Sequence, residues 1–287
     1  MMRVTPRYEN DEAALATMHG KERVIAPLLR GALGLQVRVT PGIDTDRFGT
    51  FSRDIDRKGS QLDAARAKIA AAFAIAPTAR VAVASEGSFG PHPHVPFVPF
   101  AREIVVMQDR VSGLELIGHY AGMETNFSHA IVADIDGAVV FARRALFPGH
   151  GLIVIGCVEQ QPMPARALIK DIGDWDTLQR AVAEVITSCG AAFVETDMRA
   201  HRNPTRMRTI KRATIDLVRR FRRPCPNCAR PGFSLTQRLV GLPCAWCGGP
   251  THAVKADVHA CEGCAYREER AVQAEAADPG QCGACNP

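Results

Sequence analysis

The chain has 287 residues, of which 46% are hydrophobic and 23% charged, with a formal net charge of +5. This composition is ordinary for a soluble globular protein and excludes a disordered chain. No apolar run reaches the roughly 18 residues that a membrane helix needs. The N-terminal residues also lack the apolar core of a signal peptide, so we expect a cytoplasmic protein with no membrane association.

Strand and helix patterns alternate over residues 1–200. Alternating or β-rich apolar runs predict strands at 12–18, 35–40, 80–85, 103–108, 114–120, 151–158 and 191–198. Helical spacing predicts helices at 22–33, 62–74, most of 131–147 and 175–188. The second helix follows Ser60, a candidate N-cap. This alternation predicts one α/β domain with a mixed central sheet flanked by helices.

A basic helix is expected over residues 201–223, with Asn203 as its cap and Pro204 at its first position. Residues 196–223 contain ten Lys or Arg and two Asp, a local net charge of +8. Such a stripe indicates either an anionic partner, with nucleic acid bound through residues 199–223, or a solvated helix face.

Residues 224–287 are predicted to form a small zinc-ribbon-like domain, because four CxxC pairs follow one another there. Two such pairs complete a tetrahedral Cys₄ site, so eight thiolates predict two structural zinc ions. Sequential pairing fits the spacing, while nested and interleaved pairings stay open, as do iron–sulfur ligation and redox dithiols. Cys157 and Cys189 are expected to be small buried residues. The predicted zinc ligands are Cys225, Cys228, Cys244, Cys247, Cys261, Cys264, Cys282 and Cys285.

Polar residues at two predicted strand ends suggest a phosphate site with a divalent metal. His19 and Lys21 follow the first strand and open a helix, where backbone N–H groups suit a phosphate. Asp44 and Asp46 follow the second strand, and one residue between two carboxylates suits Mg²⁺ or Mn²⁺. Arg57, in the same polar loop, is a candidate phosphate ligand. A solvated turn and a charged surface loop explain the same residues.

The third polar segment follows the strand at 80–85. Glu86 is a candidate metal ligand, Ser88 a candidate ligand-binding residue and His92 a candidate acid–base group. The alternative for His92 is a surface loop position between prolines. Asn126 is a further candidate ligand-binding residue. Arg199, His201 and Arg206 are also candidates, with a structural network at the domain junction as their alternative.

Several motifs together resemble a bacterial family described as a domain of unknown function. They are ATMHGKE, DTDRFGTF, ASEGSFGPHP, ETNFSH, FPGHGLIV, ETDMRAHRNPTRM, GLPC and the closing CNP. The resemblance covers nearly the full length and implies no activity.

Residues 12–120 are also similar to the inosine/xanthosine triphosphatase group of nucleotide pyrophosphatases. The similarity lies in Ala16-Thr17 with Lys21, in Ala64-Ala65-Arg66 with Lys68, and in the run from Val83 to Gly87. It implies that Lys21 binds phosphate and Glu86 binds Mg²⁺, although His19 stands where that group carries Asn.

These observations lead to a Mg²⁺-dependent hydrolase of a phosphorylated, nucleotide-like small molecule as the first hypothesis. The alternative is a nucleic-acid or ribonucleoprotein binder that uses the basic helix and the zinc module. A zinc module that serves self-association or partner docking is a third hypothesis.

Overall fold

The computed structural model describes residues 8–45 and 59–286. The chain forms two compact units, Met1–Val218 and Arg219–Pro287. Within the described residues, no helix has both the length and the apolar character needed to cross a membrane.

The N-terminal unit begins with a mixed five-stranded sheet. Its strands, in spatial order, are β2 (Gln36–Val39), β1 (Glu12–Ala16), β3 (Val81–Pro91), β4 (Pro99–Asp109) and β5 (Leu114–Gly122). β1 runs parallel to β2 and β3, whereas β3, β4 and β5 are antiparallel neighbours. The strands predicted at 103–108 and 114–120 are therefore β4 and β5, which form an antiparallel hairpin.

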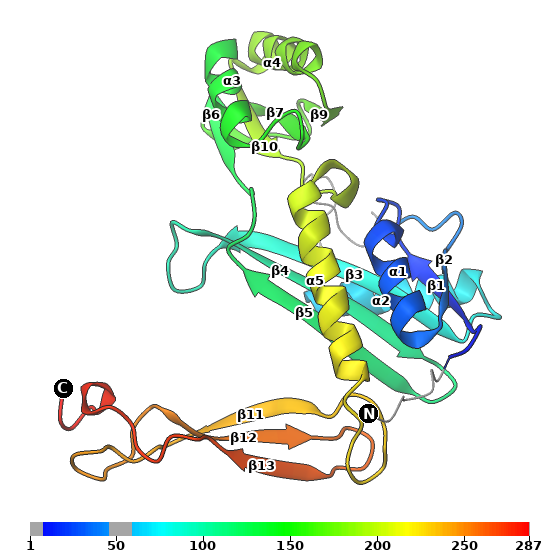
Figure 1. The fold of residues 1–287 in the computed structure, drawn as a ribbon. Coiled ribbons are helices and arrows are strands. Elements are labelled where there is room, and N and C mark those ends of the chain that lie inside the picture. Colours follow the sequence, from blue (N-terminus) through cyan, green and yellow to red (C-terminus); the bar gives the residue numbers. More distant parts are fainter. Residues whose placement is uncertain (1–7, 46–58, 287) are drawn as a thin grey trace. The chain divides into compact units, whose positions relative to one another are not determined.

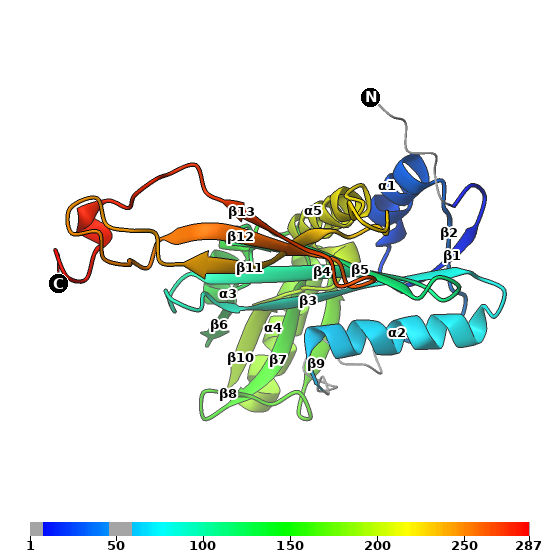
Figure 2. The ribbon, with the colours of Figure 1, turned by 90° about the horizontal axis from the view of Figure 1, so that it is seen from below.

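Helices cover both faces of this sheet. Helix α2 (Gln61–Ile75) packs on one face, and α1 (Glu22–Leu33) and α5 (Pro204–Phe221) lie on the other (Figure 2). Ser60 caps α2 in a capping box, as predicted. Gly118 of β5 lets α5 approach closely, because a Cβ there would lie 2.1 Å from the backbone oxygen of Ala213.

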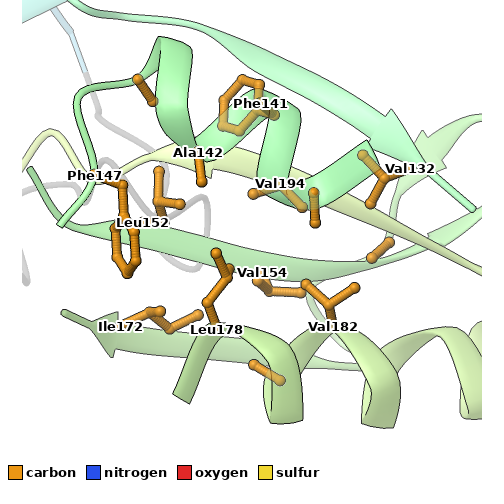
Figure 3. Packing of buried hydrophobic residues seen from close by; sticks show 14 of the residues in the cluster. Val132, Phe141, Ala142, Phe147, Leu152, Val154, Ile172, Leu178, Val182 and Val194 are labelled. Atoms are coloured by element: carbon orange, nitrogen blue, oxygen red, sulfur yellow. The ribbon is translucent and has the colours of Figure 1, made fainter. Parts of the chain in front are cut away.

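A second sheet forms the rest of the N-terminal unit (Figure 1). Its strands are β6 (His129–Val132), β10 (Ala191–Thr196), β7 (Leu152–Val158) and β8 (Gln161–Pro162), with β9 (Leu168–Ile172) also paired to β7. Side chains of α3 (Ile135–Arg144) and α4 (Trp175–Cys189) meet those of β7 and β10 in one core (Figure 3). The mixed α/β prediction is confirmed, but the strands are divided between two sheets. The predicted helix at 131–147 is shorter, because β6 takes its start and Asp134 caps α3.

The short 3₁₀ helix η2 (Ala200–Arg202) leads into α5. The Asn203 side chain accepts a hydrogen bond from the Arg206 N–H at 2.9 Å, which confirms the predicted cap.

The C-terminal unit is an antiparallel ribbon of β11 (Ser234–Val240), β12 (Val254–Ala260) and β13 (Arg267–Ala271), followed by η3 (Pro279–Gln281). Few large apolar side chains are buried in it; the principal ones are Phe221, Phe233, Leu242 and Val258. So small a core is typical of a domain that a metal stabilises.

Candidate functional site

A pocket of about 550 Å³ lies where β1 and β2 end, and we call it the edge pocket. Its lining comes from residues 17–22, except 19 and 21, and from residues 39–44. Because β1 and β2 are parallel, their carboxyl ends meet at one edge of the sheet, where open α/β sheets bind ligands. The structure thus brings the predicted His19–Lys21 turn and Asp44 to the same edge.

Backbone donors gather at this turn. The N–H groups of Gly20, Lys21 and Glu22 have no hydrogen-bond partner among residues 8–45 and 59–286. They precede or open the 12-residue helix α1, and Gly20 adopts a left-handed φ of 70°. Unpaired N–H groups at a helix start favour an anion.

The Lys21 side chain turns away from the pocket into a buried cluster of charges. Its Nζ donates to the Ser85 carbonyl at 3.1 Å. Around it lie two buried ion pairs, one between Lys68 and Glu86 and one between Arg206 and Glu103. Burial, followed by the charges of Arg206 and Lys68, lowers the pKa of Lys21 from 10.5 to about 7.

This buried cluster contains three basic groups and two carboxylates, so its charge depends on Lys21. With Lys21 neutral, the two ion pairs balance. With Lys21 protonated, the region beneath the turn carries one excess positive charge, which an anion at the N–H groups would compensate.

The sequence predicts that the strand ends before Glu86, but Glu86 lies within it. β3 continues through Pro91 and pairs with β4 along its whole length, so Glu86 is a buried strand residue bound to Lys68. The Gln61 amide also donates to the Glu86 carbonyl at 2.6 Å. In the part of the chain that the structure describes, only cysteines form groups of three or more metal-ligating side chains. Glu86 therefore does not fit the predicted role of Mg²⁺ ligand.

Ser88 and His92 also lie away from Lys21. Ser88 is exposed on β3. His92 lies in the turn after β3, edge-on to Phe100 with ring centroids 4.8 Å apart. His92 lies six positions beyond Glu86 along extended strand, a span of about 20 Å. The predicted acid–base role of His92 beside Glu86 has no geometric basis.

Gly87 lies where strand β3 passes a buried ion pair. A Cβ at Gly87 would lie 2.6 Å from Oε1 of Glu103 and 2.8 Å from the Arg206 guanidinium. The glycine makes room for a buried ion pair. Arg206 was predicted to bind ligand. Its guanidinium instead forms an ion pair with Glu103 at 2.6 Å and lies over the Phe89 ring.

Sequence reasoning assigned no site role to Lys68 and did not single out Glu103. Each carried a detectable signal, which is a charged residue at an apolar position. Lys68 lies between Ala64 and Ala72 on the buried face of α2. Glu103 begins the apolar run of β4, and its side chain is fully buried.

Arg199 belongs to the structural network that the sequence left as an alternative, and Asn126 is part of the same network. The Asn203 amide donates to Oδ1 of Asn126 at 2.9 Å. Arg199 pairs with Asp197 at 2.7 Å and with Asp171 at 3.0 Å. Both contacts hold the segment between β10 and α5 in place.

His201 and His19 form a stacked pair, with ring centroids 4.9 Å apart. Burial, followed by the neighbouring His19 and Arg199, lowers the pKa of His201, so its ring is neutral at pH 7. This pair lies beside the predicted phosphate turn.

Acidic partners neutralise part of the positive charge of residues 196–223. Glu124 pairs with both Arg208 and Arg212, and Asp171 also pairs with Arg202. With Arg199 and Arg206, five arginines of the stripe therefore have a carboxylate partner. The positive charge available to bind nucleic acid is therefore smaller than the sequence suggests.

The eight CxxC cysteines gather into two groups, each with four Sγ atoms within 4.8 Å of one another. The groups are Cys225, Cys228, Cys261 and Cys264, and Cys244, Cys247, Cys282 and Cys285. Sγ–Sγ distances between pairs are 3.7–3.9 Å. Zinc with four sulfurs at about 2.3 Å sets neighbouring sulfurs about 3.8 Å apart, so both groups fit the ion.

Pairing is interleaved, first with third and second with fourth, and not sequential. The reason is the β11–β12 hairpin, in which Ser234 pairs with Ala260 and Val240 with Val254. The first and third CxxC turns therefore flank one end of the ribbon. The second turn lies at the other end, where a bridge from Cys244 to Ala277 brings the fourth.

One cysteine of the first group is prepared for metal binding by its neighbours. The Asn227 amide donates to the Cys264 sulfur at 3.5 Å and is the main cause that lowers the pKa of this thiol to about 6. A thiolate is the form that ligates zinc. Closed Cys₄ sites of this kind are structural, because no coordination position is left for substrate.

Two predicted site residues, Asp46 and Arg57, lie outside the described residues.

Fold and cysteine groups together define an α/β protein with a zinc-ribbon-like C-terminal unit. The chain belongs to the family described as Domain of unknown function (DUF6671), whose sequence pattern matches residues 72–287. This confirms the predicted resemblance to such a family. The match includes the zinc ligands, Glu86 and Arg206, and begins after the residues that line the edge pocket.

A comparison with curated proteins found no match. The similarity of residues 12–120 to nucleotide pyrophosphatases therefore stays a prediction.

Proposed function

We propose that this protein hydrolyses a phosphorylated, nucleotide-like small molecule bound in the edge pocket. The observation that carries the proposal is the set of unpaired N–H groups at Gly20, Lys21 and Glu22 beside that pocket. Three unpaired backbone donors at the start of a helix suit a phosphate group and give a neutral ligand no comparable advantage.

The buried cluster strengthens this preference. Lys21 has a pKa of about 7, so it is partly protonated at neutral pH. A phosphate at the turn favours the protonated form, and the proton that Lys21 takes up is part of the binding reaction. Lys21 acts here through its field, since its Nζ is hydrogen-bonded to Ser85 and does not face the pocket.

Lining residues of the pocket supply the other requirements of a substrate site. Met18, Val39 and Ile43 offer apolar surface to the organic part of a substrate. Asp44 and Glu22 offer carboxylates on the same lining. A carboxylate there can remove a proton from water as the water oxygen bonds to phosphorus. The ester oxygen then leaves and takes up a proton, and phosphate stays at the N–H groups.

A thermal-shift screen of zinc-loaded, full-length protein tests the proposal. Nucleotides and sugar phosphates are compared with their unphosphorylated counterparts, each with and without Mg²⁺ or Mn²⁺. Phosphorylated ligands should raise Tm, because they bind the folded state alone. Ligands that do so are then assayed for release of phosphate and pyrophosphate.

Asp44→Asn separates binding from chemistry. It should lower turnover at least about hundredfold, as expected for loss of a general base, and keep the ligand-induced rise in Tm. Asp136→Asn, an exposed acid in the first turn of α3, is the matched control and should behave as wild type. If the folded protein neither binds nor hydrolyses any phosphorylated compound, the proposal is wrong.

A further inference from the structure

A second pocket, of about 340 Å³, lies between α1 and α5, and we call it the helix pocket. Residues 20, 23 and 24 line it from the start of α1, and residues 204, 207, 208 and 211 line it from α5. Both sets have the helical spacing of a single face, so each helix turns one side toward this space. Gly20 lines both this pocket and the edge pocket.

The lining of the helix pocket is cationic. Arg23, Arg208 and Lys211 contribute three positive charges, and no acidic residue lines the pocket. Arg208 forms an ion pair with Glu124 at 3.0 Å. Among residues 8–45 and 59–286, neither Arg23 nor Lys211 has an acidic partner.

Like charges that converge on one space are unfavourable without an anion between them. Elsewhere on α5 in this unit, Arg206 pairs with Glu103, and the Glu124 carboxylate is shared between Arg212 and the pocket residue Arg208. The helix pocket therefore stands out as a place where cations from two helices meet with little compensation.

Shape indicates the size and class of the anion. A volume of about 340 Å³ suits a small molecule. Val24 and Met207 give the pocket an apolar wall, and the stacked His201 ring forms part of its border. Such a lining fits a compact anion with an attached organic group, whereas a polymer backbone needs charges spread along a surface.

We infer that the helix pocket binds a multiply charged small anion of the phosphate class, so that the N-terminal unit has two anion sites on either side of Gly20. The inference uses Arg23, Arg208 and Lys211, on which the proposed hydrolysis does not depend. The two claims can therefore fail separately.

The test is calorimetric titration of zinc-loaded, full-length protein with inorganic phosphate and with pyrophosphate. Arg23→Gln and Lys211→Gln should each weaken pyrophosphate binding roughly tenfold, because each removes a charged donor. Both side chains are exposed, so the variants should fold. Arg30→Gln, an exposed arginine in the last turn of α1, is the matched control and should bind as wild type.

Three results would overturn the inference. They are no binding at millimolar pyrophosphate, equal losses in Arg30→Gln and the two pocket variants, and tighter binding of a nucleic-acid duplex than of pyrophosphate. Loss of pyrophosphate binding in the pocket variants, with or without hydrolysis of any ester, would support it. Raising the salt concentration should weaken the binding, since the pocket side chains reach solvent.

Discussion

Lys21→Met should remove a distinctive pH dependence from the stability of the N-terminal unit. Lys21 is 5% exposed, and its pKa falls from 10.5 in the unfolded chain to about 7 in the folded one. That fall corresponds to roughly 5 kcal/mol between the two protonation states. Methionine has a similar length and no charge, so it keeps the packing of the buried stem.

The sign follows from proton binding. Between pH 7 and 10.5 the unfolded chain binds this proton and the folded protein does not, so stability rises as pH rises. From pH 7 to pH 9 the contribution of Lys21 should increase by about 2 kcal/mol. Below pH 7 both states hold the proton, and the contribution levels off. Lys21→Met should lack this rise.

Urea unfolding at pH 7, 8 and 9 measures the effect. Trp175 packs edge-on against Phe147 at 4.8 Å, so its fluorescence in a Trp246→Phe background reports on the N-terminal unit. The difference between wild type and variant cancels the pH dependence of the zinc thiolates. Lys211→Met, an exposed lysine, serves as control and should follow wild type. Parallel pH profiles for wild type and Lys21→Met would refute the reasoning.

Three further predictions concern packing, charge and metal. Gly118→Ala should destabilise the N-terminal unit by about 3 kcal/mol in denaturant unfolding, because its Cβ meets the backbone of Ala213, which cannot rotate away. Glu103→Gln should cost about 3–5 kcal/mol in the same experiment by leaving Arg206 buried without its counter-charge, and a loss below 1 kcal/mol would contradict this. Serine at both cysteines of the first CxxC pair should reduce bound zinc from two ions to one and expose only the third pair to alkylation. Exposure of the second pair instead would indicate sequential pairing.

Local patterns in the sequence predicted much of this fold. Hydrophobic spacing located α1, α2 and α4, and the Ser60 and Asn203 caps lie where helix-start chemistry placed them. The division of strands between two sheets was beyond such reasoning. Strand patterns give the side-chain alternation of a segment and not its neighbour, and β7 pairs with β10 across more than thirty residues of intervening chain.

Sequence patterns also predicted the accessibility of the candidate site residues only in part. Polar residues that follow short strands were expected to be accessible, which holds for Asp44 at the end of β2. It fails for Glu86, because β3 extends six residues beyond its apolar run. The extension is enforced by β4, whose Glu103 pairs opposite Gly87 and meets Arg206 from α5.

Burial changes what a charged residue can do, and this has a consequence for assigning function to the chain. Glu86 and Arg206 are candidate site residues in the sequence, yet each is held by a buried partner whose removal would be strongly destabilising. Lys21 differs, because its Nζ is hydrogen-bonded to the neutral Ser85 carbonyl, and burial, followed by the charges of Arg206 and Lys68, lowers its pKa to about 7. Among these buried groups, Lys21 is the one whose charge an incoming anion can change, and a phosphate at the turn above it would bind with uptake of a proton. Calorimetric titrations in buffers of different ionisation enthalpy would detect that proton, and a buffer-independent enthalpy would show that Lys21 does not respond to the ligand.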